Sequence, residues 1–348
     1  MSVAPKETER GTVLLTTLLI MTIMAAITVA LMDDIQLSVK RTLNVQAYAQ
    51  ADWQAVGAED FVTAYLKTDF VALAPEAKTA LLQSRTPLVL PTPDGVITLT
   101  LKDASHCFNL NSVVTETGGE NDTAKLELGQ LGELLGLPQN QATVLTSALI
   151  DWQDADQQQS TGGAEDGTYL RKNPPYRTAD TAMRGPEELR ALHGMDEDLW
   201  ELYRPYVCTG GAGVMPKVNV NSISVERTFI LAAALSGVVS GSDAAPVAQS
   251  LLRDRPLTGY SSAQQIDQVL DTSGVQGLSR DRISIDVSSI FVEVVTEVGP
   301  AERVRTYRFD GVDTDTPRLT YRGWGRETFR LEIETETEQN SENEVDTR

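Results

Sequence analysis

The chain has 348 residues, of which 41% are hydrophobic, and its formal net charge is −20. This length and hydrophobic share predict a globular protein of one large or two modest domains, because enough apolar surface is available for a packed core. The negative charge argues against nucleic-acid binding, since phosphate backbones are repelled by a field of the same sign. With only two histidines, His106 and His193, and two isolated cysteines, Cys107 and Cys208, a zinc site of standard ligand spacing is not expected.

The N-terminal region predicts a membrane-spanning helix. Residues 1–11 are polar and include Lys6 and Arg10, whereas residues 12–32 contain no charged side chain. A helix of that length spans about 30 Å, the thickness of a bilayer's hydrocarbon core. Three interpretations compete: a cleaved secretory signal, an uncut membrane anchor, and a short leader that is removed after Gly11. The secretory signal fits least well, because its apolar core would be shorter and would end at a clear small-residue cleavage site.

The segment 33–66 predicts that the helix continues beyond the membrane. It contains no proline and one glycine, Gly57, and its apolar residues recur at three- and four-residue steps. Such spacing is typical of an amphipathic helix. We therefore expect one long rod, with one half in the membrane and the other half packed on a globular head.

The Arg10-Gly11 boundary followed by this helix resembles the leader of type IV pilins and type II secretion pseudopilins. The resemblance implies that a prepilin peptidase cuts after Gly11 and that the mature chain starts at Thr12. Pilin-like subunits usually carry glutamate at the fifth mature position, where this chain has Thr16. A carboxylate in lipid is tolerated only when it is paired, and a subunit at a filament tip has no neighbour above it to pair with. The missing glutamate is characteristic of the K-type minor pseudopilins.

Four later segments predict a sheet. Residues 96–101 are mostly β-branched or alternate in polarity, and strand periodicity returns at 283–298, 304–309 and 318–322. We expect these strands to form one antiparallel sheet against the long helix. The short motif Phe-Asn-Leu-Asn-Ser-Val, which starts at residue 108, resembles the strand that precedes the inserted domain of K-type pseudopilins.

The middle of the chain predicts helices, at 126–152, in 187–207 and within 222–280, with polar loops at 114–125 and 151–176. From residue 151 to residue 207 the order of motifs resembles the inserted helical domain of the K-type minor pseudopilin: Asp-Trp-x-Asp-x-Asp, Gly-Gly-Ala-Glu-Asp, Pro-Pro-Tyr, Gly-Met-Asp and Arg-Pro-Tyr-Val. The segment around Gly-Met-Asp also resembles a helix-hairpin-helix or sterile-alpha-motif-like unit.

The predicted fold class is α+β, a pilin-like fold with a long N-terminal helix packed on an antiparallel sheet and a large inserted α-helical domain. The expected organisation is a leader at 1–11, a transmembrane part at 12–32, pilin-like core at 33–113 and 283–332, an inserted helical domain at 114–282 with subregions 114–214 and 215–282, and an acidic disordered tail at 333–348.

One acidic loop suggests a ligand. Asp151, Asp154, Asp156, Glu165 and Asp166 lie close together in the sequence and alternate with glycines, although not at EF-hand spacing. A solvated acidic loop is the alternative interpretation. The resemblance implies calcium, because K-type pseudopilins bind calcium in this insertion, and clustered carboxylates repel one another unless a cation joins them.

The two cysteines allow two interpretations. Cys107 and Cys208 are either two buried thiols or, in an oxidising compartment, one disulfide that closes a loop of about a hundred residues and contributes up to about 4–5 kcal/mol. Sequence alone does not fix the distance between them.

These observations predict a structural protein and no enzyme, since neither a nucleophile elbow nor a zinc site of standard ligand spacing is present. We expect a single-pass protein of the bacterial inner membrane with its head in the periplasm, at the tip of a type II secretion pseudopilus. Its expected partners are the I- and J-type minor pseudopilins, the prepilin peptidase, and secreted cargo or the outer-membrane secretin. Two alternatives are a membrane-anchored periplasmic binding module and a DNA-uptake protein; acidic residues beside Gly194 argue against the latter.

Overall fold

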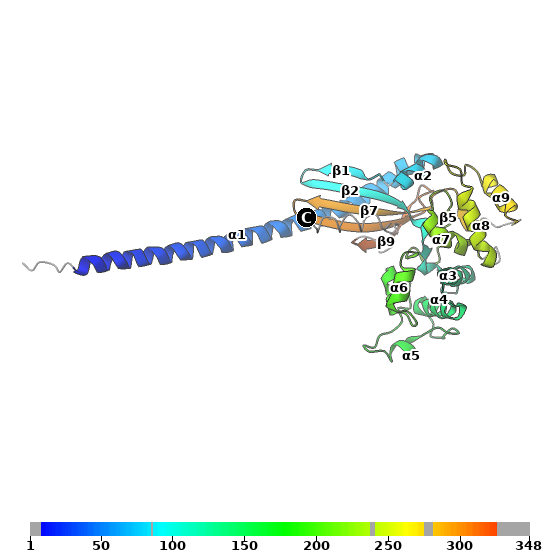
Figure 1. Ribbon diagram of the computed structural model, residues 1–348, viewed down its shortest axis with the longest axis horizontal. Coiled ribbons are helices and arrows are strands. Elements are labelled where there is room, and N and C mark those ends of the chain that lie inside the picture. The colour runs from blue at the N-terminus through cyan, green and yellow to red at the C-terminus, as the bar shows by residue number, and fades with distance from the viewer. Residues whose placement is uncertain (1–7, 85, 237–240, 275–280, 326–348) are drawn as a thin grey trace, which may run out of the picture.

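The computed structural model describes residues 8–84, 86–236, 241–274 and 281–325. Helix α1 (Thr8–Tyr65) projects from one side of the head as a long rod (Figure 1). Every side chain from residue 12 to residue 46 is exposed, and this part is long and apolar enough to cross a membrane. The second half of α1 packs on the head, where Ala51 and Ala55 are fully buried. The predicted rod, half apolar span and half packed helix, is what the structure shows.

A π-helical turn, Leu66–Phe70, and helix α2 (Pro75–Ser84) follow α1 and lead into a five-stranded sheet. The strands are β1 (Leu88–Thr92), β2 (Gly95–Asp103), β7 (Ser289–Val298), β8 (Ala301–Asp310) and β9 (Arg318–Trp324), and every neighbouring pair is antiparallel. Their order across the sheet is β1-β2-β7-β8-β9, so strands from before and after the insertion meet where β2 pairs with β7. This antiparallel sheet agrees with the prediction.

The sheet packs against α1 because its strands alternate between buried and less buried side chains. Ile97, Leu99 and Leu101 of β2 are buried on one face, as alternation with a period of two requires. Two side chains also bind backbone carbonyls of α1: Thr296 donates to the carbonyl of Ala51 over 3.0 Å, and Tyr307 donates to that of Ala55 over 3.1 Å. These bonds fix the register between helix and sheet.

The insertion has two helical halves, and each is bracketed by a short parallel strand pair. In the first half, β3 (Phe108–Asn109) pairs with β4 (Val207–Cys208); in the second, β5 (Val218–Asn219) pairs with β6 (Ile283–Ser284). The first half contains α3 (Asp122–Leu134), α4 (Gln139–Gln153), the short α5 (Asp166–Tyr169), a 3₁₀ segment (Pro186–Ala191) and α6 (Glu197–Tyr203). The second contains α7 (Thr228–Leu235), α8 (Gly241–Arg253) and α9 (Ala263–Thr272).

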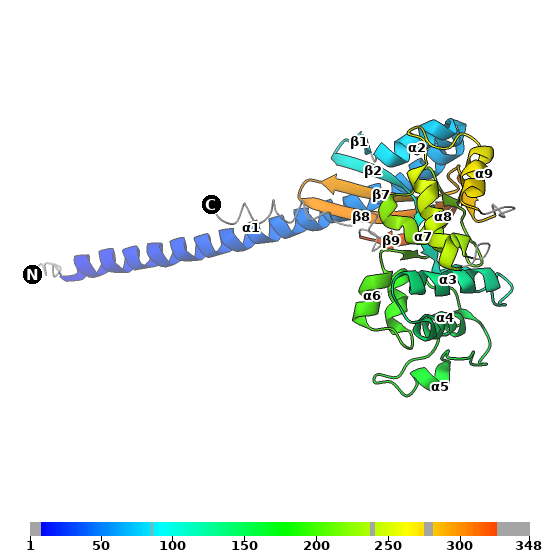
Figure 2. The ribbon, with the colours of Figure 1, turned by 45° about the vertical axis from the view of Figure 1, so that its right-hand side comes forward.

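The two halves of the insertion lie in different directions from the sheet. Helices α7–α9 lie at the end of the sheet that points away from the apolar part of α1, and α3–α6 extend to one side, with α5 farthest from α1 (Figures 1 and 2). The insertion has its own hydrophobic core, which includes Leu131, Leu149 and Leu231 and is separate from the core between α1 and the sheet.

Several boundaries differ from those predicted. The helical segment at 126–152 is two helices, because Gly136 has a positive φ of 97° and Pro138 follows it. Helix α3 already begins at Asp122, inside the predicted loop, because Asn121 caps it. Residues 88–92 form the edge strand β1, which is not among the four strands predicted from the sequence. The acidic tail predicted at 333–348 and most of the leader predicted at 1–11 lie outside the described residues.

Candidate functional site

The structure brings three acidic side chains of the predicted calcium loop together. Asp151 and Asp154, at the end of α4, and Glu165, directly before α5, place one carboxylate oxygen each within 4.8 Å of the others. No other such group of three exists in the part of the chain that the structure describes. The cluster lies in the first half of the insertion, in the region predicted from the sequence.

Glycine makes room for this cluster. A side chain at Gly163 would place its Cβ 2.1 Å from Oδ2 of Asp151, so only glycine allows the loop to pass so close to that carboxylate. Asp151 itself is fully buried, and its two oxygens each accept a 3.2 Å hydrogen bond from the backbone nitrogen of Ser160. The loop therefore wraps tightly around a buried anion.

The other two carboxylates lack sufficient hydrogen-bond partners. Both side-chain oxygens of Glu165 and Oδ1 of Asp154 are buried without a hydrogen bond. Burial, together with neighbouring carboxylates, raises the pKa of Glu165 to about 7 and that of Asp154 to about 6. Buried acceptors without donors are unfavourable, and a bound cation would satisfy them and remove the repulsion. The donor set, three carboxylates, suits calcium.

The remaining two predicted ligands point to other partners. Asp156 accepts a 2.7 Å hydrogen bond from the backbone nitrogen of Gln158. Asp166 accepts from the backbone nitrogen and the hydroxyl of Thr178, both at 3.0 Å, and forms an ion pair with Arg177. These contacts stabilise the loop around the cluster, and neither residue belongs to the group of three.

The sequence interpretation missed Asp180. This residue has a positive φ of 49°, rare outside glycine, and its backbone nitrogen bonds the carbonyl of Trp152 over 3.1 Å. Its carboxylate raises the pKa of both Asp154 and Glu165, although burial and the carboxylate of Asp151 contribute more to each rise. Its only sequence signal is an acidic residue shortly after the Pro-Pro-Tyr motif, which does not reveal the fold back onto α4.

Cys107 and Cys208 form a disulfide with a Cα–Cα distance of 5.8 Å, across the parallel pair β3–β4. Fully buried Arg308 of β8 lies beside it, with Nη1 3.0 Å from Sγ of Cys208 and Nε 3.0 Å from Oδ1 of Asp310. Burial opposes ionisation of Asp310, but Arg308 together with hydrogen bonds from Thr320 and Ser289 outweighs it, so the pKa of Asp310 is lowered. The bridge thus ties together the two ends of the first half of the insertion, and Arg308 connects it to the sheet.

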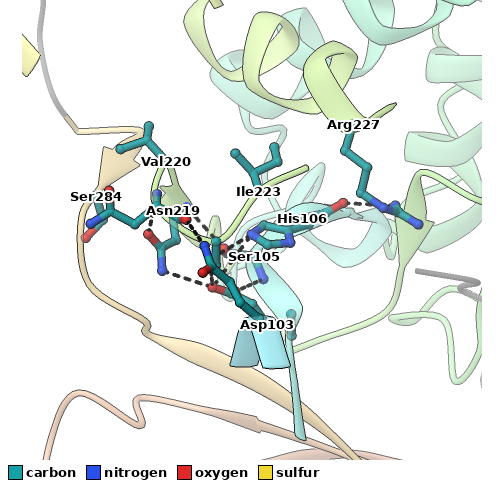
Figure 3. A network of polar contacts seen from close by, with 12 residues as sticks. Asp103, Ser105, His106, Asn219, Val220, Ile223, Arg227 and Ser284 are labelled. Atoms are coloured by element: carbon teal, nitrogen blue, oxygen red, sulfur yellow. Dashed lines mark hydrogen bonds and ion pairs between the residues drawn. The ribbon is translucent and has the colours of Figure 1, made fainter. Parts of the chain in front are cut away.

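A second polar network joins the end of β2 to the second half of the insertion (Figure 3). Asp103 accepts hydrogen bonds from the Ser105 backbone nitrogen at 2.8 Å, from Nδ2 of Asn219 at 3.1 Å and from the Ser222 hydroxyl at 2.5 Å. His106 lies in the same network, with Nε2 3.0 Å from the Ser222 oxygen, and its pKa is lowered by burial. The network connects elements about 115 residues apart in the chain.

This serine, histidine and aspartate do not form a catalytic triad. In a triad the carboxylate binds the ring nitrogen opposite to the one that faces the serine. Here Oδ2 of Asp103 accepts the hydroxyl of Ser222 directly and lies 3.6 Å from the same Nε2 of His106. The arrangement is a structural clamp rather than an activated nucleophile.

Beyond its membrane-length apolar segment, α1 also carries exposed apolar side chains. Val45 is 70% exposed, Trp53 is 75% exposed and Phe61 is 41% exposed. Side chains of this size on a helix surface offer apolar area for contact with another protein. Gly11 and Thr12 lie within α1, at the start of the apolar segment.

Comparisons with known proteins agree on one family. A family model described as "Type II secretion system (T2SS), protein K" matches residues 106–211. Type II secretion system protein K of Klebsiella pneumoniae is 32% identical over 259 residues, which cover 73% of this chain and 77% of the relative. The Aeromonas hydrophila protein of the same name is 32% identical over 304 residues, which cover 84% of this chain and 89% of the relative.

A solved structure is similar over most of the fold. It is a chain from the crystal structure of the GspK-GspI-GspJ complex of the enterotoxigenic Escherichia coli type 2 secretion system, with a TM-score of 0.65 and 25% identity. The similarity covers 82% of this chain and 99% of that one. It therefore includes the α1–sheet core and the insertion together.

Proposed function

The chain belongs to the protein K family of type II secretion systems and is a minor pseudopilin with an N-terminal membrane anchor, and from this we propose that it occupies the tip of the pseudopilus. Its role there is structural: it primes assembly of the filament and supports protein export across the outer membrane. No enzymatic step is proposed.

The observation that carries the tip proposal is the position of the insertion. Helices α7–α9 cover the end of the sheet farthest from the apolar half of α1 (Figure 1). A pilin-like subunit within a filament must accept another subunit above its head, and a head closed by these helices leaves no such surface. Thr16 supports the same conclusion, since the chain lacks the carboxylate that would pair with a subunit above it.

We propose that the protein is processed and oriented as pilin-like subunits are. A prepilin peptidase would cut after Gly11, so that Thr12 becomes the new N-terminus, and the head would lie in the periplasm. The disulfide between Cys107 and Cys208 favours this compartment, because disulfides persist where the environment is oxidising.

The proposed partners are the I- and J-type minor pseudopilins. The similar solved chain comes from a complex with GspI and GspJ, and the exposed apolar side chains of Val45, Trp53 and Phe61 on α1 offer contact area to neighbouring subunits. From the tip, the head would also meet secreted cargo or the outer-membrane secretin.

We propose calcium as the ion of the insertion, held by Asp151, Asp154 and Glu165, with Asp156 and Asp166 stabilising the loop around it. The ion would supply the positive charge that this buried cluster lacks. Its role would be structural, since the cluster ties the end of α4 to the start of α5.

The decisive experiment is N-terminal sequencing of the membrane-extracted protein, produced with and without a prepilin peptidase. A chain that starts at Thr12 only with the peptidase is the expected result. An intact N-terminus in both cases would contradict the proposal and favour an anchored binding module. Co-purification with tagged I- and J-type subunits then tests the tip complex, with Trp53→Ala as the weakened variant.

A further inference from the structure

Two adjoining hollows lie where α2 of the pilin-like core meets the second half of the insertion. Their volumes are about 250 Å³ and 520 Å³, and Gln83 and Arg255 line both. Together they form one groove that runs from the end of β2, at Lys102 and Asp103, to the turn after α8, at Leu257. Hollows of this size are sufficient for a few residues of an extended peptide.

Arg255, at the junction of the two hollows, is held rigidly on one side only. Its Nη1 donates to the carbonyl oxygens of Val220, Asn221 and Ile223 at 2.9, 3.3 and 2.7 Å. Nε and Nη2 make no hydrogen bond within the described part of the chain. Neither atom is fully buried, so solvent reaches both. The Nε–Nη2 edge is one of the two edges with which a guanidinium binds a carboxylate through two parallel hydrogen bonds.

The absence of a carboxylate partner distinguishes Arg255 from two other well-packed arginines of the head. Arg282 pairs with Glu127 and Arg308 pairs with Asp310, whereas Arg255 has only neutral carbonyls as acceptors among the described residues. It is half-buried, and burial lowers its pKa, because the charged form lacks compensation by an anion. The chain has 49 acidic residues, yet none of the described ones pairs with the rigidly held guanidinium of Arg255.

Lys102 and the apolar residues of the groove favour an anionic ligand with an apolar neighbour, and the one carboxylate on the α2 wall, Glu76, is exposed to solvent. Lys102 adds a second cation, whose only ion pair in the described chain is a 3.9 Å contact with Glu293. Asp103, the acid nearest to it in sequence, already accepts from Ser105, Asn219 and Ser222. At the other end the groove is lined by Leu252, Pro256 and Leu257, of which Leu257 is completely exposed.

We propose that this groove binds an extended acidic segment of a partner protein, with the Nε–Nη2 edge of Arg255 receiving a carboxylate and Leu257 contacting an adjacent apolar side chain. Lys102 supplies longer-range attraction to the same segment. Because one wall is α2 and the other belongs to the insertion, an occupied groove clamps the insertion onto the pilin-like core. The proposal is independent of leader processing and of calcium.

Peptide titration of the full-length protein in detergent tests the proposal. The probes are the capped peptide Ac-Leu-Glu-Leu-Glu-NH₂, its neutral counterpart Ac-Leu-Gln-Leu-Gln-NH₂ and inorganic phosphate, followed by isothermal titration calorimetry. We expect only the glutamate peptide to bind. Arg255→Lys should weaken binding about tenfold, because it keeps the charge but removes the two-point contact. Lys102→Met should weaken binding less than Arg255→Lys does. The effect of Lys102→Met should grow as the salt concentration is lowered, because the charge is then screened less.

Arg253→Gln is the matched control, since this arginine is two residues away, exposed, and paired with Asp254. It should leave the affinity unchanged. Arg255→Lys also removes bonds to three carbonyls, so its Tm is measured in parallel, and Lys102→Met tests the groove without touching those bonds. Equal binding of both peptides, stronger binding of phosphate, or unchanged affinity in both groove variants would overturn the proposal.

Discussion

Glu127 of α3 and Arg282, directly before β6, form a two-point ion pair across 155 residues of chain, with Nε–Oε1 at 2.5 Å and Nη2–Oε2 at 3.0 Å. Arg282 also donates to the carbonyls of Met215 and Pro216. The pair therefore joins the first half of the insertion, the link between its halves, and the point where the chain returns to the sheet. Burial raises the pKa of Glu127, and Arg282 opposes this rise.

Removing one member of this pair should be strongly destabilising. Glu127→Ala leaves the guanidinium of Arg282 buried without a carboxylate, and we expect a loss of about 3–5 kcal/mol in the free energy of unfolding. Glu127→Leu combined with Arg282→Met should recover much of that loss, because neither charge remains buried. Urea denaturation followed by fluorescence measures both. An equal loss in the single and double variants would show that the pair's charge is not the stabilising feature.

The carboxylate cluster predicts a pH dependence that calcium removes. The pKa values of Asp154 and Glu165 rise from 3.8 to about 6 and from 4.5 to about 7. The folded protein therefore binds more protons than the unfolded chain between about pH 4 and pH 7, so its stability should fall as the pH rises through this window. In the presence of a chelator, the Tm should fall as the pH is raised from 4 to 8. Excess calcium should flatten this dependence of Tm on pH. Glu165→Gln should also flatten it, whereas the exposed control Glu133→Gln should not.

Gly163→Ala tests whether the cluster holds the ion. The new Cβ would lie 2.1 Å from Oδ2 of Asp151, so the carboxylate must move and calcium affinity should drop at least about tenfold. Gly167→Ala is the matched control, because its Cβ would meet no atom closer than 3.9 Å. Calorimetric titration with calcium, after chelation, measures both. Similar affinities in the two variants would place the ion elsewhere.

The disulfide predicts a large loss of stability on reduction. Cys107 and Cys208 are separated by 101 positions, so their bond removes much conformational freedom from the unfolded chain, and Cys107→Ser with Cys208→Ser should cost about 4–5 kcal/mol. Denaturation of the wild type with and without a reductant measures the same difference. Addition of reductant should leave the double variant unchanged; a further loss there would point to another cause.

The contact between α1 and the sheet depends on small side chains. Ala55 is fully buried, and Tyr307 bonds its carbonyl over 3.1 Å. Ala55→Leu should overpack this contact and destabilise the head by about 1–3 kcal/mol. Val56→Leu, at the neighbouring exposed position, provides the control and should be nearly neutral for stability. Thermal unfolding in detergent distinguishes them, and an undisturbed Tm for Ala55→Leu would contradict the tight packing described here.

The sequence was sufficient for the features that depend on local patterns. An uncharged stretch at 12–32 followed by helical spacing determines a rod, and alternation at 96–101 and 283–298 determines strands, because burial requires these periods. The α+β class and the family resemblance followed from these patterns and from ordered motifs. The acidic loop could be located for the same reason, since its carboxylates are neighbours in the chain.

Contacts between distant segments were decided only by the tertiary structure. Which of five acids converge on the candidate ion depends on how the loop folds back to α4, and Asp180 joins their surroundings through a backbone conformation that no local pattern reveals. The same holds for the pairing of Cys107 with Cys208, the Glu127–Arg282 ion pair and the unpaired edge of Arg255. Periodicity records which side of an element is buried, but not which other element covers it.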